Sequence, residues 1–333
     1  MAHILILGRR RFGIGDLPRE ATSMGFEVKI HMRRYLLAFS IAGILCSSTQ
    51  LSTQEIKPSW PIPSEIKWVA VNGYPMAYRV AGNGTPIVLV HASISDYRTW
   101  NAQFDVLSVA HKVIAVSLRH YFPERWDGVG TDFSIEQHAQ DVAALIKKLN
   151  LGKVHLVGHS RGGAVVIEVA KSNPEIIRTV VLADASIAMP APETAEVKKA
   201  EKSTEKRIKT LRKNLKTGDP AKAAEVFMNM LSRPGAWKRL PKHVREMILV
   251  NIYTALEDKG CPLTSCADVN KFDYPVLLMT ADYSPPEFEF FYNEMRKCRD
   301  LPASVVIPNA GHFMQRDNPK AFNKAILAFV SQH

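Results

Sequence analysis

The feature that most constrains the fold of this 333-residue chain is a short apolar run, residues 154–157, followed by Gly158-His159-Ser160-Arg161-Gly162. The run is typical of a buried strand, and the residues after it have the composition of a helix. A serine between two glycines at such a junction predicts a nucleophile elbow, a tight strand-to-helix turn that exposes a serine hydroxyl above a sheet. Glycine suits positions 158 and 162 because the backbone of this turn packs too closely for side chains.

Strand-like and helix-like segments alternate from residue 64 onward, which is typical of an α/β fold. Asn72-Gly73 separates the first two strand-like runs and predicts a β-hairpin. Later apolar runs predict strands that are buried on both faces. Strands are expected at residues 66–71, 76–80, 86–90, 113–117, 154–157, 179–183, 274–280 and 303–307, and helices at 134–149, 164–171 and 321–330. The sequence therefore predicts an α/β fold whose eight-stranded, mostly parallel sheet is flanked by helices.

Residues 187–270 break this alternation. They contain no strand-like run, and five prolines divide them into several helical segments. We therefore expect a helical cap at residues 187–270. It would be inserted between two parts of an α/β core, residues 64–186 and 271–333.

The net charge of +11 is concentrated in two segments, so the rest of the chain is near neutral. Residues 198–216 of the expected cap contain nine Lys or Arg and two Glu, and residues 1–48 contain seven basic and three acidic residues. A solvated helix face accounts for the basic segment of the cap. The alternative is a surface that attracts anionic substrates or contacts an anionic membrane. Nucleic acid is not expected as a partner, because aromatic residues are not interleaved with these basic residues.

Residues 32–48 have the features of a signal peptide. Met32-Arg33-Arg34 precedes an apolar run at residues 35–45, and small residues follow the run. The run is too short to span a bilayer comfortably. We therefore expect Met32 to be the natural start and residues 1–31 to be a non-native upstream extension or a disordered tail. Residues 49–63 would be a linker, and the mature protein would be periplasmic or secreted.

Export would leave three cysteines in an oxidising compartment, where two of them can pair. These are Cys261, Cys266 and Cys298. Cys266 with Cys298 is the preferred pair, because both residues precede core strands, and the other pairings stay open. No Cys/His cluster has metal-ligand spacing, so no metal site is expected.

A histidine near the end of the chain is a candidate for the general base that a nucleophilic serine needs. His312 follows the last expected strand, and the small residues Ala310 and Gly311 allow a tight turn before it. A side chain in this place can lean across the carboxyl edge of the sheet, where ligands of open α/β sheets bind. The order of Ser160 and His312 along the chain also fits this architecture.

With these motifs in place, the chain resembles the α/β-hydrolase superfamily over residues 64–333. The resemblance rests on four motifs in the right order, which are Val90-His91-Ala92-Ser93, Ser117-Leu118-Arg119-His120-Tyr121, the elbow at Gly158–Gly163, and Asn309-Ala310-Gly311-His312. Two positions depart from the family pattern. The family usually has glycine at the position of Ala92, and it often has glycine at the position of His120. His91 and His120 are therefore candidates for the substrate pocket.

The elbow also predicts an oxyanion hole, the pair of donors that stabilises the charged oxygen formed in acyl transfer. The backbone N–H of Arg161 should point at the substrate oxygen. The resemblance implies that the second donor is the backbone N–H of Ser93. It also implies that residues 187–270 cover the pocket.

The carboxylate that supports His312 has two candidates. The resemblance implies an acid either after the strand expected at residues 274–280 or after that at 179–183. In the first place Ser284 stands where an aspartate is usual, and Asp282 is a nearby substitute. In the second place Asp184 lies at the tip of the strand, at the right level to hold His312 in its working tautomer. We prefer Asp184 and keep Asp282 as the alternative.

These residues predict a serine hydrolase that cleaves a small carboxylic ester through an acyl-enzyme intermediate, without a metal or organic cofactor. Serine at the elbow argues against the dehalogenase and epoxide-hydrolase branches, which use aspartate there. Hydrolysis of a lactone, an amide or a carbon–carbon bond by the same residues is the alternative. A non-catalytic binding protein is a further alternative, because fold alone does not establish function. The expected partner is a small-molecule substrate.

Overall fold

The computed structural model describes residues 63–333, except residues 125, 127, 191–194, 233 and 258. The described residues all belong to one unit of the chain, residues 52–333, which is distinct in its contacts from residues 1–51. The expected upstream extension, the signal peptide and most of the linker lie outside the described residues. In the described part, no helix combines the length and the apolar character that a membrane span needs.

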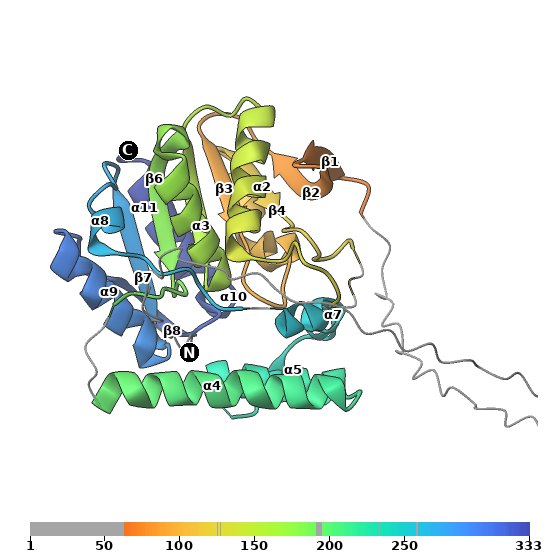
Figure 1. Cartoon of the computed structure of the whole chain (residues 1–333). Helices are drawn as coiled ribbons and strands as arrows, with labels where there is room; N and C mark the ends of the chain where they lie inside the picture. Colours follow the sequence, from red (N-terminus) through yellow and green to blue (C-terminus); the bar gives the residue numbers. More distant parts are fainter. Residues whose placement is uncertain (1–62, 125, 127, 191–194, 233, 258) are drawn as a thin grey trace, which may run out of the picture. The chain divides into compact units, whose positions relative to one another are not determined.

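Eight strands form one sheet in the order β1-β2-β4-β3-β5-β6-β7-β8 (Figure 1). They are β1 (Ile66–Val71), β2 (Tyr74–Ala81), β3 (Pro86–Val90), β4 (Lys112–Val116), β5 (Val154–His159), β6 (Ile177–Ala183), β7 (Val276–Tyr283) and β8 (Val305–Gly311). β2 pairs antiparallel with both β1 and β4, and every other pair is parallel. The predicted eight-stranded, mostly parallel sheet is confirmed. Asn72 and Gly73 form the hairpin turn with positive φ, as this turn type requires.

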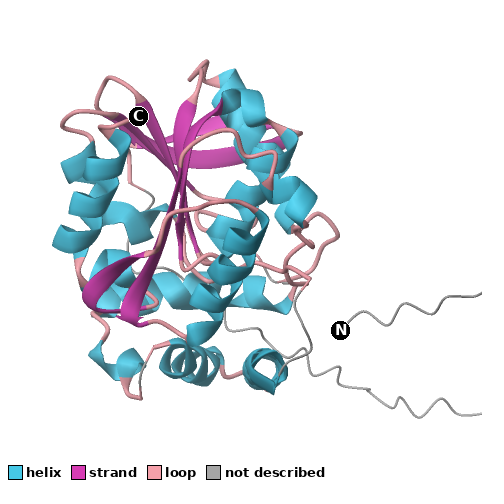
Figure 2. Ribbon diagram, turned by 90° about the vertical axis from the view of Figure 1, so that its left-hand side faces the viewer, coloured by secondary structure: helices cyan, strands magenta, loops and turns pink. Residues whose placement is uncertain are grey.

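Helices cover both faces of the sheet (Figure 2). One face carries α2 (Ile135–Lys148), α3 (Arg161–Ser172) and α9 (Pro286–Cys298), and the other carries α1 (Asn101–Leu107), α10 (Met314–Asp317) and α11 (Pro319–Val330). Each face forms its own buried apolar core, so the central strands need apolar side chains on both sides. On β3, for example, Val88 and Val90 belong to one core, and Ile87 and Leu89 belong to the other.

Between β6 and β7 the described residues form helices and no strand of the sheet. These helices are α4 (Ala195–Lys216), α5 (Pro220–Leu231), α6 (Ala236–Arg239), α7 (Lys242–Asn251), the short η3 (Ile252–Leu256) and α8 (Cys266–Val269). Several of them share a third apolar core with Ile94, from the loop after β3, and Phe313, from the loop after β8. These helices therefore pack against the loops at the carboxyl ends of the strands. We call residues 187–270 the cap.

The two connections between the cap and the sheet meet at one point, which we call the neck. Ala188 and Leu263 form an isolated parallel β-bridge. The N–H of Thr264 donates to the carbonyl oxygen of Ala188 over 2.7 Å. The chain therefore enters and leaves the helices α4 to α7 side by side.

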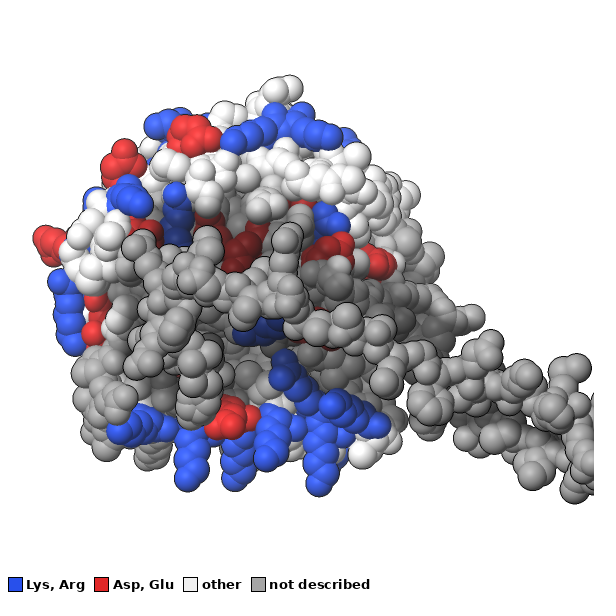
Figure 3. Space-filling view, viewed as in Figure 1, with Lys and Arg blue, Asp and Glu red and all other residues white. Residues whose placement is uncertain are grey.

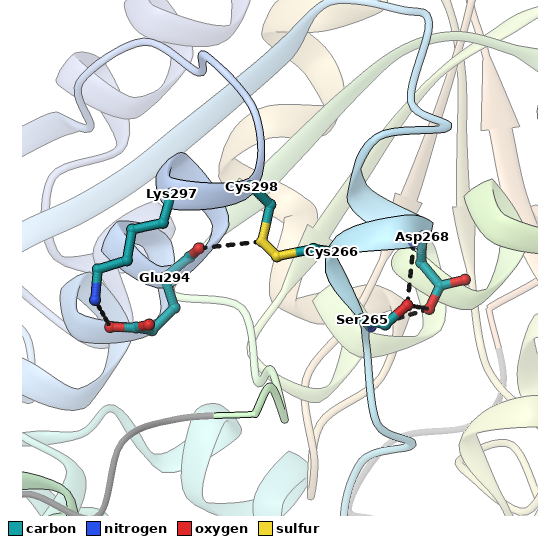
Figure 4. Close-up of a disulfide and its surroundings, with 6 residues drawn as sticks. All are labelled: Ser265, Cys266, Asp268, Glu294, Lys297 and Cys298. Carbon is teal, nitrogen blue, oxygen red and sulfur yellow. Dashed lines mark hydrogen bonds and ion pairs between the residues drawn. A yellow bond between two sulfur atoms is a disulfide. The ribbon is translucent and has the colours of Figure 1, made fainter.

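A disulfide joins Cys266, at the start of α8, to Cys298, at the end of α9 (Figure 4). The preferred pairing is confirmed. Ser265 caps α8 by accepting the N–H of Asp268, whose carboxylate in turn accepts the N–H and hydroxyl of Ser265. The disulfide therefore attaches α9 to α8, a short helix whose first turn is stabilised by the capping box of Ser265 and Asp268.

Candidate active site

Ser160 lies in the turn between β5 and α3, where it adopts φ 52° and ψ −121°. Its carbonyl oxygen accepts the N–H of Ser186 over 2.9 Å, which ties the turn to the chain that leaves β6. A Cβ atom at position 158 would lie 2.5 Å from the carbonyl oxygen of Gly162, and one at position 162 would lie 2.4 Å from that of His91. Close backbone approach therefore explains both glycines. The strained turn holds the serine at the carboxyl edge of the sheet.

His312 follows β8 and Asp184 follows β6, so the carboxyl ends of two strands carry these side chains. The Nδ1 atom of His312 lies 3.0 Å from the Oδ2 atom of Asp184, and both residues are buried. A carboxylate in this position holds the histidine with its proton on Nδ1, which leaves Nε2 to accept a proton. The imidazole of His312 lies beside that of His159, the residue before Ser160, with ring centroids 4.8 Å apart.

The alternative acid, Asp282, is not brought to His312. Asp282 is exposed near the end of β7, and its Oδ2 atom accepts the N–H of Asn309 over 2.7 Å. Its side chain therefore joins β7 to β8. Of the two candidate acids, the geometry favours Asp184.

Ser284 contacts the acid directly. Its hydroxyl donates to Oδ2 of Asp184 over 2.6 Å, the same oxygen that faces His312, and it accepts the N–H of Ala281 over 2.9 Å. Burial raises the pKa of Asp184 well above its usual range, and the hydrogen bond from Ser284 opposes this shift. Ser284 therefore favours the carboxylate form, which His312 needs as its partner.

Helix α9 contacts both His312 and the backbone beside Asp184. Phe288 stacks on the imidazole of His312, with ring centroids 4.7 Å apart and an interplanar angle of 12°. One turn further on, the hydroxyl of Tyr292 donates to the carbonyl oxygen of Leu182 and accepts the N–H of Ala185, each over 2.8 Å. Leu182 and Ala185 lie on either side of Asp184 in the chain, so Tyr292 fixes the backbone that carries Asp184.

His159 holds the loop that carries His312. The side-chain amide of Gln315 donates to Nδ1 of His159 over 3.1 Å, so the ring proton lies on Nε2. This Nε2–H donates to the carbonyl oxygen of His312 over 2.7 Å. Burial keeps the pKa of His159 well below its usual range, which preserves the neutral ring that this arrangement requires.

Arg161, the expected oxyanion donor, directs its side chain into the core. Its Nη1 atom lies 2.8 Å from Nδ1 of His138, and its guanidinium lies over the ring of Phe133. The backbone of Arg161 is the first turn of α3, where N–H groups point out of the helix. The side chain of Arg161 is therefore part of the core, and a role of this residue as oxyanion donor would involve its main chain alone.

Ser93, the second expected donor, borders a cavity of about 560 Å³ between the loop after β3 and the cap. Its apolar lining includes Ile94 from that loop, Met247 and Ile248 from α7, and Phe313. Because Phe313 follows His312 in the chain, the cavity adjoins both the expected oxyanion loop and the loop of the base. The residues that line this cavity do not include Ser160.

The expectation that His91 belongs to the substrate pocket is wrong. The ring is fully buried, and its Nδ1 atom lies 2.8 Å from the carbonyl oxygen of Ala92. Its Nε2 atom accepts the N–H of Leu118 over 3.0 Å. Burial lowers the pKa of His91 to about 4, so the ring is neutral. His91 therefore joins the loops after β3 and β4 and has no nitrogen left for a substrate.

His120 is also placed elsewhere than expected. Its ring bridges the carboxylates of Glu124 and Asp132, each over 2.8 Å, and stacks on Trp126. Burial opposes the charged form, but the two carboxylates outweigh it and raise the pKa of His120. His120 is therefore the cationic member of a cluster with Glu124 and Asp132 that stabilises the loop after β4. Both of its ring nitrogens bind these carboxylates, so neither is available to a substrate.

Sequence reasoning did not identify Phe288, Tyr292 or the roles of Ser284 and His159. A signal for α9 was present, because apolar residues at positions 288, 291, 292 and 295 follow a proline with helical spacing. Which of them would face the acid and base depends on how α9 packs, which spacing does not specify. Within the described residues, no group of three or more His, Cys, Asp or Glu side chains could hold a metal ion.

Residues 87–325 match the alpha/beta hydrolase family, and the chain belongs to that family. The sheet order and the elbow agree with this assignment.

The chain is also similar to particular proteins. A soluble epoxide hydrolase of Corynebacterium sp. is 32% identical over 120 residues, 34% of this chain and 39% of that protein. An uncharacterized protein of Mycobacterium tuberculosis is 31% identical over 123 residues, 37% of this chain and 36% of that protein. The match thus spans little more than a third of these curated relatives. The structure of a thermophilic esterase from Thermogutta terrifontis aligns with a TM-score of 0.62 at 22% identity, covering 81% of this chain and 99% of that one.

Proposed function

We propose that this hydrolase cleaves a small carboxylic ester, with Ser160 as nucleophile, His312 as general base and Asp184 as the acid that supports it. The observation that carries the proposal is the 3.0 Å contact between His312 and Asp184, beside the elbow that presents Ser160. Serine at the elbow favours acyl transfer over epoxide opening, for which the related branch uses aspartate.

The reaction has two halves. In the first, Ser160 Oγ attacks the ester carbonyl carbon while His312 Nε2 takes the hydroxyl proton. The backbone N–H groups of Arg161 and Ser93 hold the negative oxygen, and each such donor contributes about 3 kcal/mol in the transition state. The intermediate then expels the alcohol, which takes the proton from His312. The acyl group remains bonded to the serine oxygen.

In the second half, water attacks the acyl-enzyme and gives its proton to His312. Collapse of the second intermediate returns that proton to the serine oxygen and releases the carboxylic acid. Asp184 stabilises the charged imidazole in both halves and stays ionised.

A fluorophosphonate probe tests the proposal, because it forms a covalent bond with an activated serine. We expect peptide mass spectrometry to find the label on Ser160 of the wild type. Ser160→Ala and His312→Gln should both lose the label, and Ser160→Ala should reduce kcat on a p-nitrophenyl ester by about 10⁶-fold. Absence of label from the wild type, or equal labelling of Ser160→Ala, contradicts the proposal. An ester, a lactone and an amide with matched acyl groups then identify the bond that is cleaved.

A further inference from the structure

The outer side of α4 carries a continuous row of exposed lysines, which we call the lysine row. Its members are Lys198, Lys202, Lys206, Lys209, Lys213 and Lys216. They follow one another at intervals of three or four residues, so they lie on one side of the helix. Figure 3 shows basic side chains projecting along the edge of the molecule that α4 forms, with little acidic surface among them.

The opposite side of α4 packs into the cap. Leu211 and Leu215 are buried in the apolar core that also contains Ala224 of α5 and Ile252 of η3. Packing therefore fixes the rotation of the helix and turns the lysine row outward. The row lies on a single helix and does not depend on a loop conformation.

The lysine row is not explained by the stability of the helix. Like charges three or four residues apart destabilise a helix, and each lysine in the row has at least one such neighbour. The helix dipole favours cations only in the last turn, where Lys213 and Lys216 lie. Residues 206–216 contain six basic residues and no acidic one, and Glu205 is exposed beside the row among the side chains of α4 that the structure describes. The concentration of charge on this side therefore indicates an interaction partner.

The shape of the lysine row favours a flat partner. A helix of 22 residues is about 33 Å long, and the row follows its whole length. Basic side chains near an anionic bilayer each add to binding, so a straight row of six gives a strong summed attraction. A nucleic acid is disfavoured because α4 contains no aromatic residue that could stack on a base.

We propose that the lysine row docks the cap onto a bilayer that contains anionic phospholipid. The cap packs on the loops after β3 and β8, so docking brings the side of the molecule that carries Ser160 toward the lipid. Esters that partition into the bilayer are then the substrate class. This last step rests on the proposed function, whereas docking itself does not.

Vesicle binding by the full chain tests the proposal. Protein is sedimented with vesicles of phosphatidylglycerol and phosphatidylcholine, or of phosphatidylcholine alone, at about 0.1 M salt. The row variant carries four changes, Lys202→Gln, Lys206→Gln, Lys209→Gln and Lys213→Gln. A matched control carries the same loss of charge on exposed lysines of other elements, Lys67→Gln, Lys153→Gln, Lys320→Gln and Lys324→Gln. Because all three proteins share residues 1–62, any contribution of that segment cancels.

We expect the wild type and the control variant to bind the anionic vesicles, and the row variant to bind them at least about tenfold more weakly. Equal binding by the two variants would overturn the proposal, because net charge alone would then set affinity. Tighter row-dependent binding to duplex DNA than to vesicles would overturn it in favour of a nucleic acid.

Activity on a soluble p-nitrophenyl ester is measured in parallel, and all three proteins should have the same kcat. The row variant should lose turnover only on a small apolar ester presented in anionic vesicles. If the wild type cleaves neither ester but binds vesicles through the row, the proposed function fails while docking stands. If it cleaves both esters but does not bind vesicles, docking fails alone.

Discussion

Asp184 and Asp282 show at the residue scale how the same side chain takes different roles at neighbouring strand ends. Asp184 is buried and faces His312, whereas Asp282 is exposed and accepts the N–H of Asn309. The sequence placed both near the carboxyl edge but left the choice open. The choice depends on which strand end faces a histidine more than a hundred residues away in the chain, and no local pattern records that.

Asp184→Asn is expected to lower kcat on a p-nitrophenyl ester by about 10⁴-fold, because an amide donates where His312 must donate and so favours the wrong tautomer. Asp282→Asn is the matched control, and its kcat should stay close to that of the wild type. Because Ser284 lies 2.6 Å from the same oxygen of Asp184, we expect the double change Asp184→Asn with Ser284→Asp to regain part of the lost activity. A large loss in Asp282→Asn would show that the acid has been assigned to the wrong residue.

Ser284→Ala tests how the acid is kept ionised. The hydrogen bond from Ser284 opposes the rise that burial causes in the pKa of Asp184, so its removal raises that pKa further. Activity requires the carboxylate and is lost as the pH falls through the pKa of the pair. The acidic limb of the kcat–pH profile should therefore move to higher pH, with kcat near neutral pH reduced by about tenfold or more. A lower kcat with an unchanged pH profile would assign Ser284 to packing alone.

His91 and His120 show why a motif alone does not place a side chain. The sequence correctly located both at the ends of strands, but their rings turn away from the pocket toward partners that other segments supply. His91 accepts the N–H of Leu118, and His120 lies between Glu124 and Asp132. The direction of a ring depends on these distant partners, which become visible only in the folded chain.

At the scale of elements, α9 links the disulfide to His312 and to the backbone around Asp184. Its first half carries Phe288 and Tyr292, which contact His312 and the backbone around Asp184, and its end carries Cys298. The strands were predictable from sequence because continuous apolar runs reflect burial on two faces. α9 was not predicted, although the apolar residues at positions 288, 291, 292 and 295 have helical spacing, and which of them faces His312 depends on how the helix packs.

The disulfide is expected to hold α9 in place. Cys266→Ser should lower the free energy of unfolding by about 3–4 kcal/mol, because the bond joins residues 32 positions apart and restricts the unfolded chain. The melting temperature, measured by circular dichroism, should fall by about 6–12 °C. Cys261→Ser is the control, and its melting temperature should fall much less. If reductant lowered the melting temperature of Cys266→Ser as much as that of the wild type, the bond would not be the source of the stability.

At the scale of the whole molecule, the sequence predicted the eight-stranded sheet and the break at residues 187–270 where the described residues form helices. Both predictions rest on the spacing of apolar residues along the chain, which reflects the burial of each segment. The order of strands in the sheet and the contact of the cap with Ile94 and Phe313 arise from packing between distant segments. No stretch of sequence contains that information by itself.

The neck has a consequence for how this molecule can change over evolutionary time. Since the chain leaves and returns at Ala188 and Leu263, the helices between them can be replaced by recombination without altering the pairing of β6 with β7. Ser160, Asp184 and His312 all lie outside the stretch between Ala188 and Leu263, so such a replacement would leave them in place. Exchange of one contiguous stretch of gene would therefore renew these helices and keep the sheet unchanged.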